Sequence, residues 1–327
     1  MVTIERMWTE SFRPRNLADI VGQVGIIERI TQFVRRVDFP HMLFAGPPGV
    51  GKTTTAEAIV NGIYQSGDRT ANVKRLNASD DRGIGVVRED IKNFARIIPS
   101  GSATFKIIIL DEADQMTSEA QHALRRTMEQ YNALTRFILI CNYSSRIIPP
   151  IQSRCAIFRF RNLEKEEVME RLRFIADKKN LAVDEEALEA LYDSSEGDMR
   201  QAINVLQAAS VMDTKISSKT IQTLQGYVKP DQVRKIIQEA IKPQPNFLTA
   251  RKLLQDLMEV YGLSGQDIVR YLNRELIRFP NEKLSDTVRF TALSMLSEID
   301  YRLSAGCNPL VQFDAFLAKF IVAAQSR

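Results

Sequence analysis

Residues 46–53 read GPPGVGKT and match the phosphate-binding loop pattern G-x-x-x-x-G-K-[ST]. An apolar segment, MLFA at 42–45, precedes the loop, and a helical segment beginning TTAEAIV follows it. In this strand-loop-helix context, backbone amides wrap phosphates, the Lys52 ammonium neutralises the β and γ oxygens, and the Thr53 hydroxyl is placed to ligate Mg²⁺. A glycine-rich turn without a ligand is the alternative, and the flanking segments disfavour it. The stretch predicts an α/β fold with a nucleotide site.

Two further motifs follow apolar strands. IIILDEAD, residues 107–114, ends a strand in carboxylates, so Asp111 would hold Mg²⁺ and Glu112 would polarise an attacking water as general base. Asn142 follows the strand RFILICN and is expected beside Asp111 at the same sheet edge. Taken alone, such acids are often helix N-caps and such an asparagine often lies in a turn. The order of the motifs along the chain favours the site.

The surrounding pattern sets the fold class. Before Asn162, apolar strands alternate with helical segments, which predicts an α/β phosphate-loop core with a parallel sheet and helices on both faces. Beyond Asn162 the strand pattern ends and amphipathic helices follow. We expect three domains: a nucleotide-binding core at 1–163, a three-helix lid at 164–228 and an all-α domain at 229–327.

Composition excludes several classes of protein. The 327 residues carry a net charge of +4, and no apolar run reaches the roughly 20 residues that span a bilayer, so no membrane role is expected. The three cysteines are widely spaced and indicate neither a disulfide framework nor a zinc site. Residues 1–163 hold 22 basic and 16 acidic residues, against 22 and 24 in 164–327, which permits a polyanionic partner for the first half.

Two arginines lie near predicted functional elements. Arg154 follows IIPPIQ and is placed to project into a neighbouring subunit as an arginine finger, whereas Arg200 opens a lid helix and is placed over the γ-phosphate. For either residue alone, a surface salt bridge is the ordinary interpretation.

Seven motifs together identify a resemblance. WTESFRP at 8–14 is followed in order by LADIVGQ, NASDDRGI, ILDEAD, ALRRTME, IQSRC and EGDMRQAIN. This series resembles the AAA+ ATPases and, more narrowly, the small subunits of replication factor C, the clamp loaders of archaea and eukaryotes. The match covers most of residues 8–207. WTESFRP departs from the family's WVEKYRP box at Thr9, Ser11 and Phe12.

The resemblance implies an active ATPase that uses ATP and Mg²⁺. Thr9, Arg13 and Val21 would line the adenine pocket. Asp111 and Glu112 become the acidic pair, with Thr53 and Asp111 on the metal. Asn142 and Arg200 become the two nucleotide sensors, and Arg154 the finger for the next subunit. The phosphates would be wrapped by Gly46, Pro47, Pro48, Gly49, Val50, Gly51, Lys52, Thr53 and Thr54.

The resemblance also implies DNA and protein partners. Arg82, Arg88 and Lys92 are expected to contact the DNA backbone, although a mixed-charge helix face is usually only solvated. Phe94, Ile97 and Ile98 would dock on a sliding clamp of the proliferating cell nuclear antigen type, or else pack in the core. The other expected partners are primer-template DNA, a replication factor C large subunit and further small subunits, in a hetero-oligomer expected to be a pentamer.

The implied function is to open the clamp and load it onto primer-template DNA, driven by ATP binding and hydrolysis. A branch-migration type of AAA+ remodeller and a nucleotide-binding scaffold subunit are the alternatives. An archaeal chain would act in the cytoplasm at the chromosome, and a eukaryotic one in the nucleus.

Overall fold

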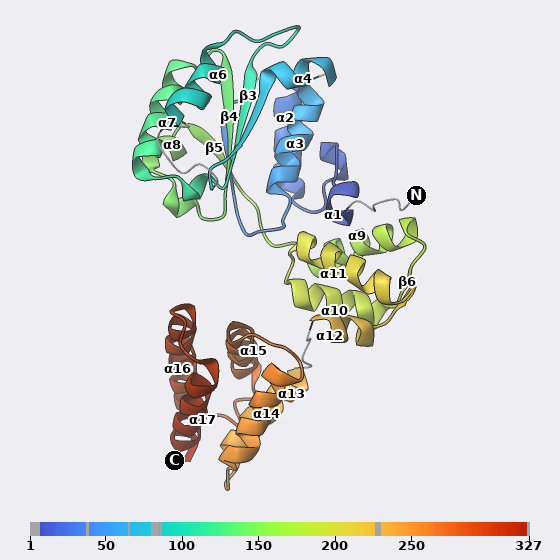
Figure 1. Cartoon of the computed structure of the whole chain (residues 1–327), viewed down its shortest axis with the longest axis vertical. Coiled ribbons are helices and arrows are strands. Elements are labelled where there is room, and N and C mark those ends of the chain that lie inside the picture. The colour runs from blue at the N-terminus through green and yellow to red at the C-terminus, as the bar shows by residue number, and fades with distance from the viewer. Residues whose placement is uncertain are drawn as a thin grey trace. The chain divides into compact units, whose positions relative to one another are not determined.

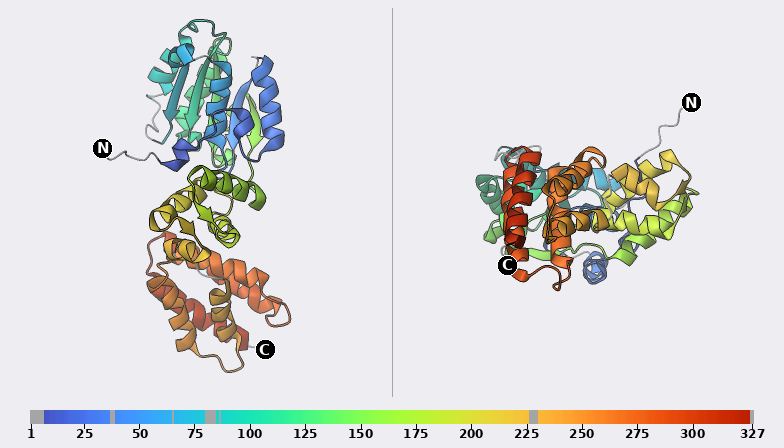
Figure 2. Two further views of the ribbon diagram at one scale, coloured as in Figure 1. Left: turned by 90° about the vertical axis from the view of Figure 1, so that its right-hand side faces the viewer. Right: turned by 90° about the horizontal axis from the view of Figure 1, so that it is seen from below.

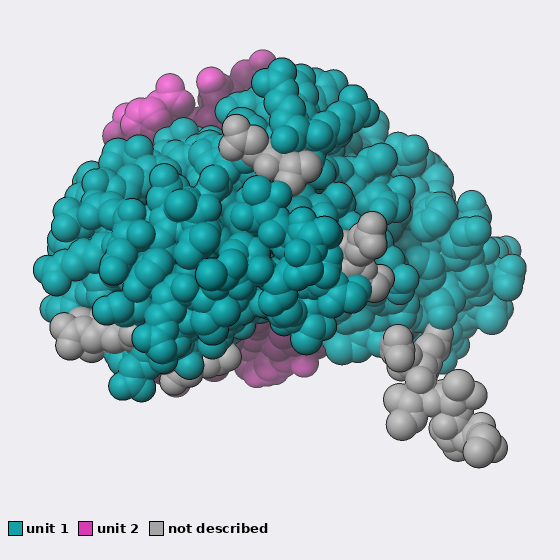
Figure 3. Space-filling model, turned by 90° about the horizontal axis from the view of Figure 1, so that it is seen from above, with its two compact units in different colours: residues 1–218 teal, residues 219–327 magenta. Residues whose placement is uncertain are grey.

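The computed structural model describes residues 7–36, 39–64, 66–79, 85, 87–225 and 230–325. The chain divides into two compact units, residues 1–218 and 219–327 (Figure 3). The described part of the first unit contains a parallel sheet of five strands in the order β2-β3-β4-β1-β5 (Figure 1). The strands are β1 (His41–Ala45), β2 (Val73–Asn77), β3 (Lys106–Asp111), β4 (Thr135–Cys141) and β5 (Cys155–Arg159).

Helices cover both faces of the sheet, as predicted (Figure 1). Successive strand residues point to opposite faces. Leu43 therefore packs in one apolar cluster with residues of α6, α7 and α8, while Met42 and Phe44 pack in another with residues of α2 and α3. Both faces are buried, which explains why β1 and β3 read as continuous apolar runs. The helices are α2 (Val24–Arg36), α3 (Lys52–Ile63), α4 (Ser66–Asn72), α6 (Lys92–Arg96), α7 (Ser118–Gln130) and α8 (Pro149–Gln152).

The strand order brings the predicted motifs together. β1, β3 and β4 are neighbours, and their carboxyl ends meet at one sheet edge because all of them run parallel. The phosphate-binding loop follows β1, Asp111 ends β3 and Asn142 follows β4. The segments after β3 and β4 contain the short helices η3 (Ala113–Gln115) and η4 (Ser144–Arg146).

Helices follow the core, as predicted, with one addition. The paired strands β6 and β7 have two residues each, too few to give an alternating pattern in the sequence. The short helix α1 (Trp8–Ser11) packs on α11, where the Trp8 backbone N–H donates to Oε1 of Gln207 at 2.9 Å. The elements are α9 (Lys165–Lys178), β6 (Ala182–Val183), α10 (Glu185–Ser195), α11 (Met199–Met212), β7 (Lys215–Ile216) and α12 (Ser218–Gln225).

The second unit is helical throughout its described part, and its helices lie alongside one another around one apolar core (Figure 2). Their breaks fall at the segments KPQPN, YGLSG, FPNEKLSD and SAGCNP, where proline, glycine and asparagine interrupt the helical pattern. No described helix is both long and apolar enough to cross a membrane. Besides residues 219–225 of α12, the helices are α13 (Pro230–Ile241), α14 (Phe247–Glu259), α15 (Gly265–Arg278), α16 (Asp286–Ser304) and α17 (Pro309–Gln325).

Residues 77–97 read as a turn followed by a helix that starts near Gly85, and in the structure part of this helix is π-helical. Among its described residues, Gly85 is α-helical, η2 (Val87–Ile91) is π-helical and α6 is α-helical. A π-helix bonds residues i and i+5, so its residues are spaced differently around the axis. The four-residue spacing of Arg88, Lys92 and Arg96 predicts that they share one face of a regular α-helix, and this shared face stays a prediction.

Candidate functional site

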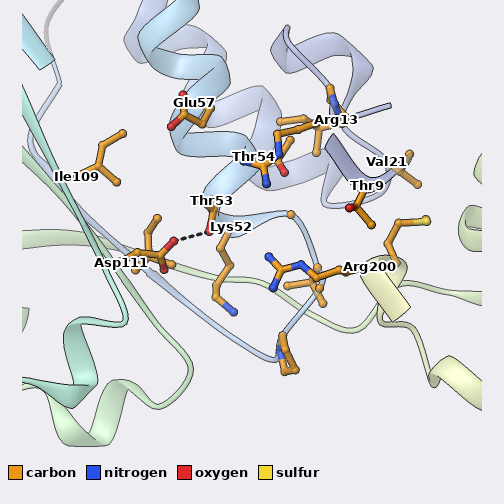
Figure 4. A pocket seen from close by; sticks show the side chains of 18 of the residues that line it. Thr9, Arg13, Val21, Lys52, Thr53, Thr54, Glu57, Ile109, Asp111 and Arg200 are labelled. Carbon is orange, nitrogen blue, oxygen red and sulfur yellow. Dashed lines mark hydrogen bonds between the residues drawn. The ribbon is translucent and has the colours of Figure 1, made fainter. Parts of the chain in front are cut away.

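A cavity of about 480 Å³ lies at the carboxyl edge of the sheet (Figure 4). Its walls come from the N-terminal segment, the phosphate-binding loop, α3, the strands β2, β3 and β4, and the lid helices α9 and α11. The predicted site residues that line it are Thr9, Arg13, Val21, Pro48, Gly49, Val50, Gly51, Lys52, Thr53, Thr54, Asp111, Glu112, Asn142 and Arg200.

Lys52 is held by three acceptors. Its Nζ donates to the carbonyl oxygens of Gly46 and Pro47, both at 2.6 Å, and to Oδ1 of Asn142 at 3.0 Å. Lys52 is only 7% exposed, and this burial lowers the pKa of the ammonium from its ordinary value. The carboxylates of Asp111 and Asp114 act in the opposite direction. A phosphate bound here would add negative charge and favour the protonated lysine.

The predicted metal ligands lie side by side. The Thr53 hydroxyl donates to Oδ2 of Asp111 at 2.8 Å, marked by the dashed line in Figure 4. A hydroxyl and one carboxylate fit Mg²⁺, which takes oxygen ligands and is usually held by one or two carboxylates together with phosphate oxygens. Among the described residues, no group of three or more His, Cys, Asp and Glu side chains suits a metal ion. The donor set fits a metal brought with a nucleotide better than one in a protein cage.

Glu112 has an unusual backbone conformation. Its φ is 52°, in the left-handed region, and its N–H donates to Oδ1 of Asp111 at 3.0 Å. A left-handed conformation costs a residue with a side chain about 1–2 kcal/mol. The turn places Glu112 in the cavity wall, next to the predicted metal ligand.

The lid contacts the phosphate-binding loop directly. The Met199 N–H donates to the Gly49 carbonyl at 3.3 Å, and the Asp198 carboxylate lies against the Cα of Gly49. Asp198 also caps α11, because its Oδ1 accepts from the Gln201 N–H at 3.0 Å. Arg200 extends from α11 towards the loop (Figure 4).

Arg154 does not line the cavity. Its guanidinium forms an ion pair with Glu129 of α7 and donates to the Pro150 carbonyl at 2.7 Å. The side chain keeps 37% of its surface exposed, so a neighbouring molecule can reach it.

Lys92 lines a second cavity, of about 520 Å³, between α6 and α7. Arg82 and the side chain of Arg88 lie outside the described residues. Two further cationic or titratable side chains, His122 and Arg126, line this cavity, and Glu119 lies in the same wall.

The predicted clamp contacts differ from one another in burial. Phe94 is partly buried and packs against the core cluster, and the Lys106 ammonium lies 4.1 Å from its ring centroid. Ile97 and Ile98 are 54% and 74% exposed. Core packing therefore describes Phe94, while the two isoleucines form an exposed apolar tip.

Sequence reasoning missed several residues of the first cavity. Arg171, Met199 and Ile203 line it from the lid, and Ile109 lines it from β3. The lid residues gave no signal because they lie more than 100 positions after the loop, in helices with ordinary amphipathic patterns. Only the docking of the lid brings them to the cavity.

Three family models match the chain. The ATPase family associated with various cellular activities (AAA) matches residues 42–163, the RCF1/5-like AAA+ ATPase lid domain 170–211, and the replication factor C C-terminal domain 228–319. The replication factor C small subunit of Aeropyrum pernix is 50% identical over 316 residues, which cover 96% of this chain and 95% of the relative. That of Archaeoglobus fulgidus is 48% identical over 312 residues, covering 95% and 96%.

The chain belongs to the replication factor C small-subunit family. It is an AAA+ ATPase with a clamp-loader role, as the motifs predicted. The RuvB Holliday junction branch migration motor of Thermotoga maritima has a similar fold, with a TM-score of 0.53 over 80% of this chain and 85% of that one, at 18% identity. That likeness concerns the fold alone, so the branch-migration alternative is not favoured. Family membership places the chain among nucleotide-binding subunits of a multi-subunit assembly.

Proposed function

We propose that this chain binds ATP with Mg²⁺ in the first cavity and hydrolyses it to load a sliding clamp onto primer-template DNA. The proposal rests on one observation above all. Lys52 and Thr53 begin α3 after the loop that follows β1, Asp111 ends β3, and Asn142 follows β4. They form two hydrogen-bonded pairs, Lys52 with Asn142 and Thr53 with Asp111.

In this proposal each side chain acts on a different part of ATP. Lys52 neutralises the β and γ oxygens, and Asn142 and Arg200 sense the γ-phosphate from the core and from the lid. Thr53 and Asp111 hold Mg²⁺, which neutralises the charge that develops on the phosphates. Glu112 accepts the proton of the attacking water.

We assign Arg154 to the ATP of the neighbouring subunit. Its side chain is partly exposed and does not line its own cavity. Hydrolysis would then require assembly, and the proposed assembly is a hetero-oligomer with a large subunit and further small subunits. We propose the domain limits 1–163, 164–228 and 229–327, with the last domain as the oligomerisation collar.

DNA contact is proposed for Lys92, together with Arg82 and Arg88. The cationic side chains of the second cavity support a backbone contact, because phosphates are recognised by Lys and Arg without regard to sequence. Clamp contact is proposed for Ile97 and Ile98, with the partly buried Phe94 beneath them. The place of action is the chromosome, where primed DNA occurs.

The test is steady-state ATP hydrolysis by the assembled complex with no addition, with primed DNA, and with primed DNA plus a clamp of the proliferating cell nuclear antigen type. We expect strong stimulation in the third case. A flat response would refute clamp loading, and absent hydrolysis with intact ATP binding would favour the scaffold alternative.

Glu112→Gln should remove hydrolysis but keep ATP binding, whereas Glu282→Gln, at an exposed acid in the second unit, should change neither. Ile98→Ser should remove only the share of stimulation that depends on the clamp.

A further inference from the structure

Asp114, the last acid of IIILDEAD, holds the loop that carries Asn142. It lies in η3 after β3, and its side chain is buried, with 7% of the residue exposed. Its Oδ2 accepts two backbone N–H groups, from Asn142 at 3.3 Å and from Tyr143 at 3.1 Å. Both donors lie directly after β4. One carboxylate therefore joins the ends of two neighbouring strands at the sheet edge where the cavity lies.

The bonds reach the reaction site through Asn142. The amide Oδ1 of this residue accepts from Nζ of Lys52 at 3.0 Å, so the path runs from Asp114 through the Asn142 backbone to the phosphate-binding lysine. Tyr143 does not carry the path onward, because its side chain is 61% exposed.

The ordinary roles of a buried aspartate do not account for Asp114. It does not cap the short helix that contains it, since the N-cap of η3 is Glu112. No ion pair found among the described residues includes it. Its second oxygen, Oδ1, is buried without a hydrogen-bond partner, which costs about 1–3 kcal/mol in a folded protein. A neutral Asn or Ser would satisfy the same N–H groups at lower cost.

The charge itself has a use at this position. Hydrogen bonds to a charged acceptor are stronger than those to a neutral one. An aspartate therefore holds the backbone N–H groups of Asn142 and Tyr143 more firmly than a neutral residue would.

We propose that Asp114 is a positioning residue for hydrolysis, which fixes the Asn142 amide relative to Lys52. This inference rests on the function proposed above for Asn142. Loss of the carboxylate frees the loop after β4 while the phosphate-binding loop and the lid keep their own contacts. The expected effect is on kcat more than on ATP binding, because a displacement of about 1 Å at a catalytic group can reduce a rate by about 100-fold.

A double-mutant cycle with Asn142→Ala tests the proposal. In the complex stimulated by primed DNA and clamp, Asp114→Ala should lower kcat by about 10- to 100-fold and change the Kd of ATP by less than about 3-fold. In the Asn142→Ala background the same change should lower kcat by less than about 2-fold, because its target is already absent. Asp114→Asn, which keeps one acceptor oxygen, should restore part of kcat. Asp177→Ala, at an exposed acid of α9, is the matched control and should behave as the wild type.

Each other outcome overturns the proposal. If the two substitutions multiply their effects on kcat, Asp114 does not act through Asn142, while the proposed function stands. If ATP affinity falls as much as kcat, Asp114 supports the pocket in general. If Asp114→Ala does not fold, judged by circular dichroism, the cycle with Asp114→Asn decides, and failure of both variants to fold makes the role one of stability alone. Absence of stimulated hydrolysis in the wild type would overturn the inference and the proposed function together.

Discussion

Gly49→Ala should separate the lid from the phosphate-binding loop. Gly49 has a φ of +68°, and a Cβ at this position would lie 1.8 Å from Oδ1 and 2.2 Å from Cγ of Asp198. Neither atom belongs to the free end of a long side chain, since Asp198 is fixed as the cap of α11. The loop and the lid must therefore move apart, and the bond from the Met199 N–H to the Gly49 carbonyl is lost with them.

The magnitude follows from three contributions. A left-handed alanine costs about 1–2 kcal/mol. Moving Asp198 removes a helix cap worth about 1 kcal/mol, and the lost backbone bond contributes about 1 kcal/mol. A penalty of about 3 kcal/mol on the closed arrangement corresponds to about 100-fold weaker binding, because 1.4 kcal/mol is a factor of ten. The lid supplies Arg200 and Ile203 to the cavity, so we expect the Kd of ATP to rise by about this factor.

The assay is an equilibrium titration with a fluorescent ATP analogue, accompanied by urea unfolding. Adding Asp198→Gly to Gly49→Ala removes the clashing carboxylate and should recover about 10-fold in affinity, since glycine as a cap costs only a few tenths of a kcal/mol while the cost of the left-handed alanine remains. Gly67→Ala is the matched control, because no atom lies within 4 Å of its added Cβ. Affinity within about 2-fold of the wild type in Gly49→Ala, or no recovery in the double variant, would refute the reasoning.

Three further predictions concern other parts of the first unit. Arg154→Ala should abolish hydrolysis stimulated by DNA and clamp and leave the Kd of ATP within about 2-fold; loss of ATP binding in the same titration would instead place its role in its own subunit. Lys92→Ala should weaken DNA binding and reduce the slope of log K against log salt by about 1, measured by fluorescence anisotropy, and an unchanged slope would move the phosphate contact elsewhere. Burial and, to a smaller extent, the charge of Arg136 lower the pKa of His41 from 6.5 to about 4 in the folded chain. As the pH falls, His41 therefore takes up a proton at a higher pH in the unfolded chain than in the folded chain. The free energy of unfolding should therefore decrease by about 3 kcal/mol between pH 6.5 and 4 in urea titrations, and His41→Gln should flatten this change.

The sequence predicted those parts of the site that lie at strand ends. The phosphate-binding loop, Asp111 and Asn142 each lie at the end of an apolar strand. Parallel pairing brings the carboxyl ends of such strands together, independently of the conformation of the connecting loops. The contact of Asp198 with Gly49 depends instead on the angle at which the lid meets the core, and no local pattern encodes that angle. The left-handed backbone conformation of Glu112 could not be predicted from the sequence either, because glutamate has no preference for it.

The three bonds of Lys52 lead to a last prediction. An ammonium group has three donors, and here Gly46, Pro47 and Asn142 occupy all of them. An arriving phosphate must therefore replace at least one acceptor. The bond to Asn142 is the longest, at 3.0 Å against 2.6 Å for both carbonyls, so it is the one that we expect to exchange first. Asn142 would then be free to contact the γ-phosphate of ATP. ADP has no γ-phosphate, so with ADP bound Asn142 would lose its bond to Lys52 without forming a new one.

The Asn142→Ala variant should consequently bind ADP as tightly as the wild type or up to about 10-fold more tightly. In this variant ADP does not have to break the Lys52–Asn142 bond, and a bond to a charged group is worth about 1.5–3 kcal/mol. The same variant should lose hydrolysis of ATP. Isothermal titration with ADP and with a non-hydrolysable ATP analogue measures the difference between the two nucleotides. If ADP bound about 10-fold more weakly to the variant, the Lys52–Asn142 bond would have to persist in the nucleotide complex. In that case the lysine would give up a loop carbonyl instead, and Asn142 would hold Lys52 in place without sensing the γ-phosphate.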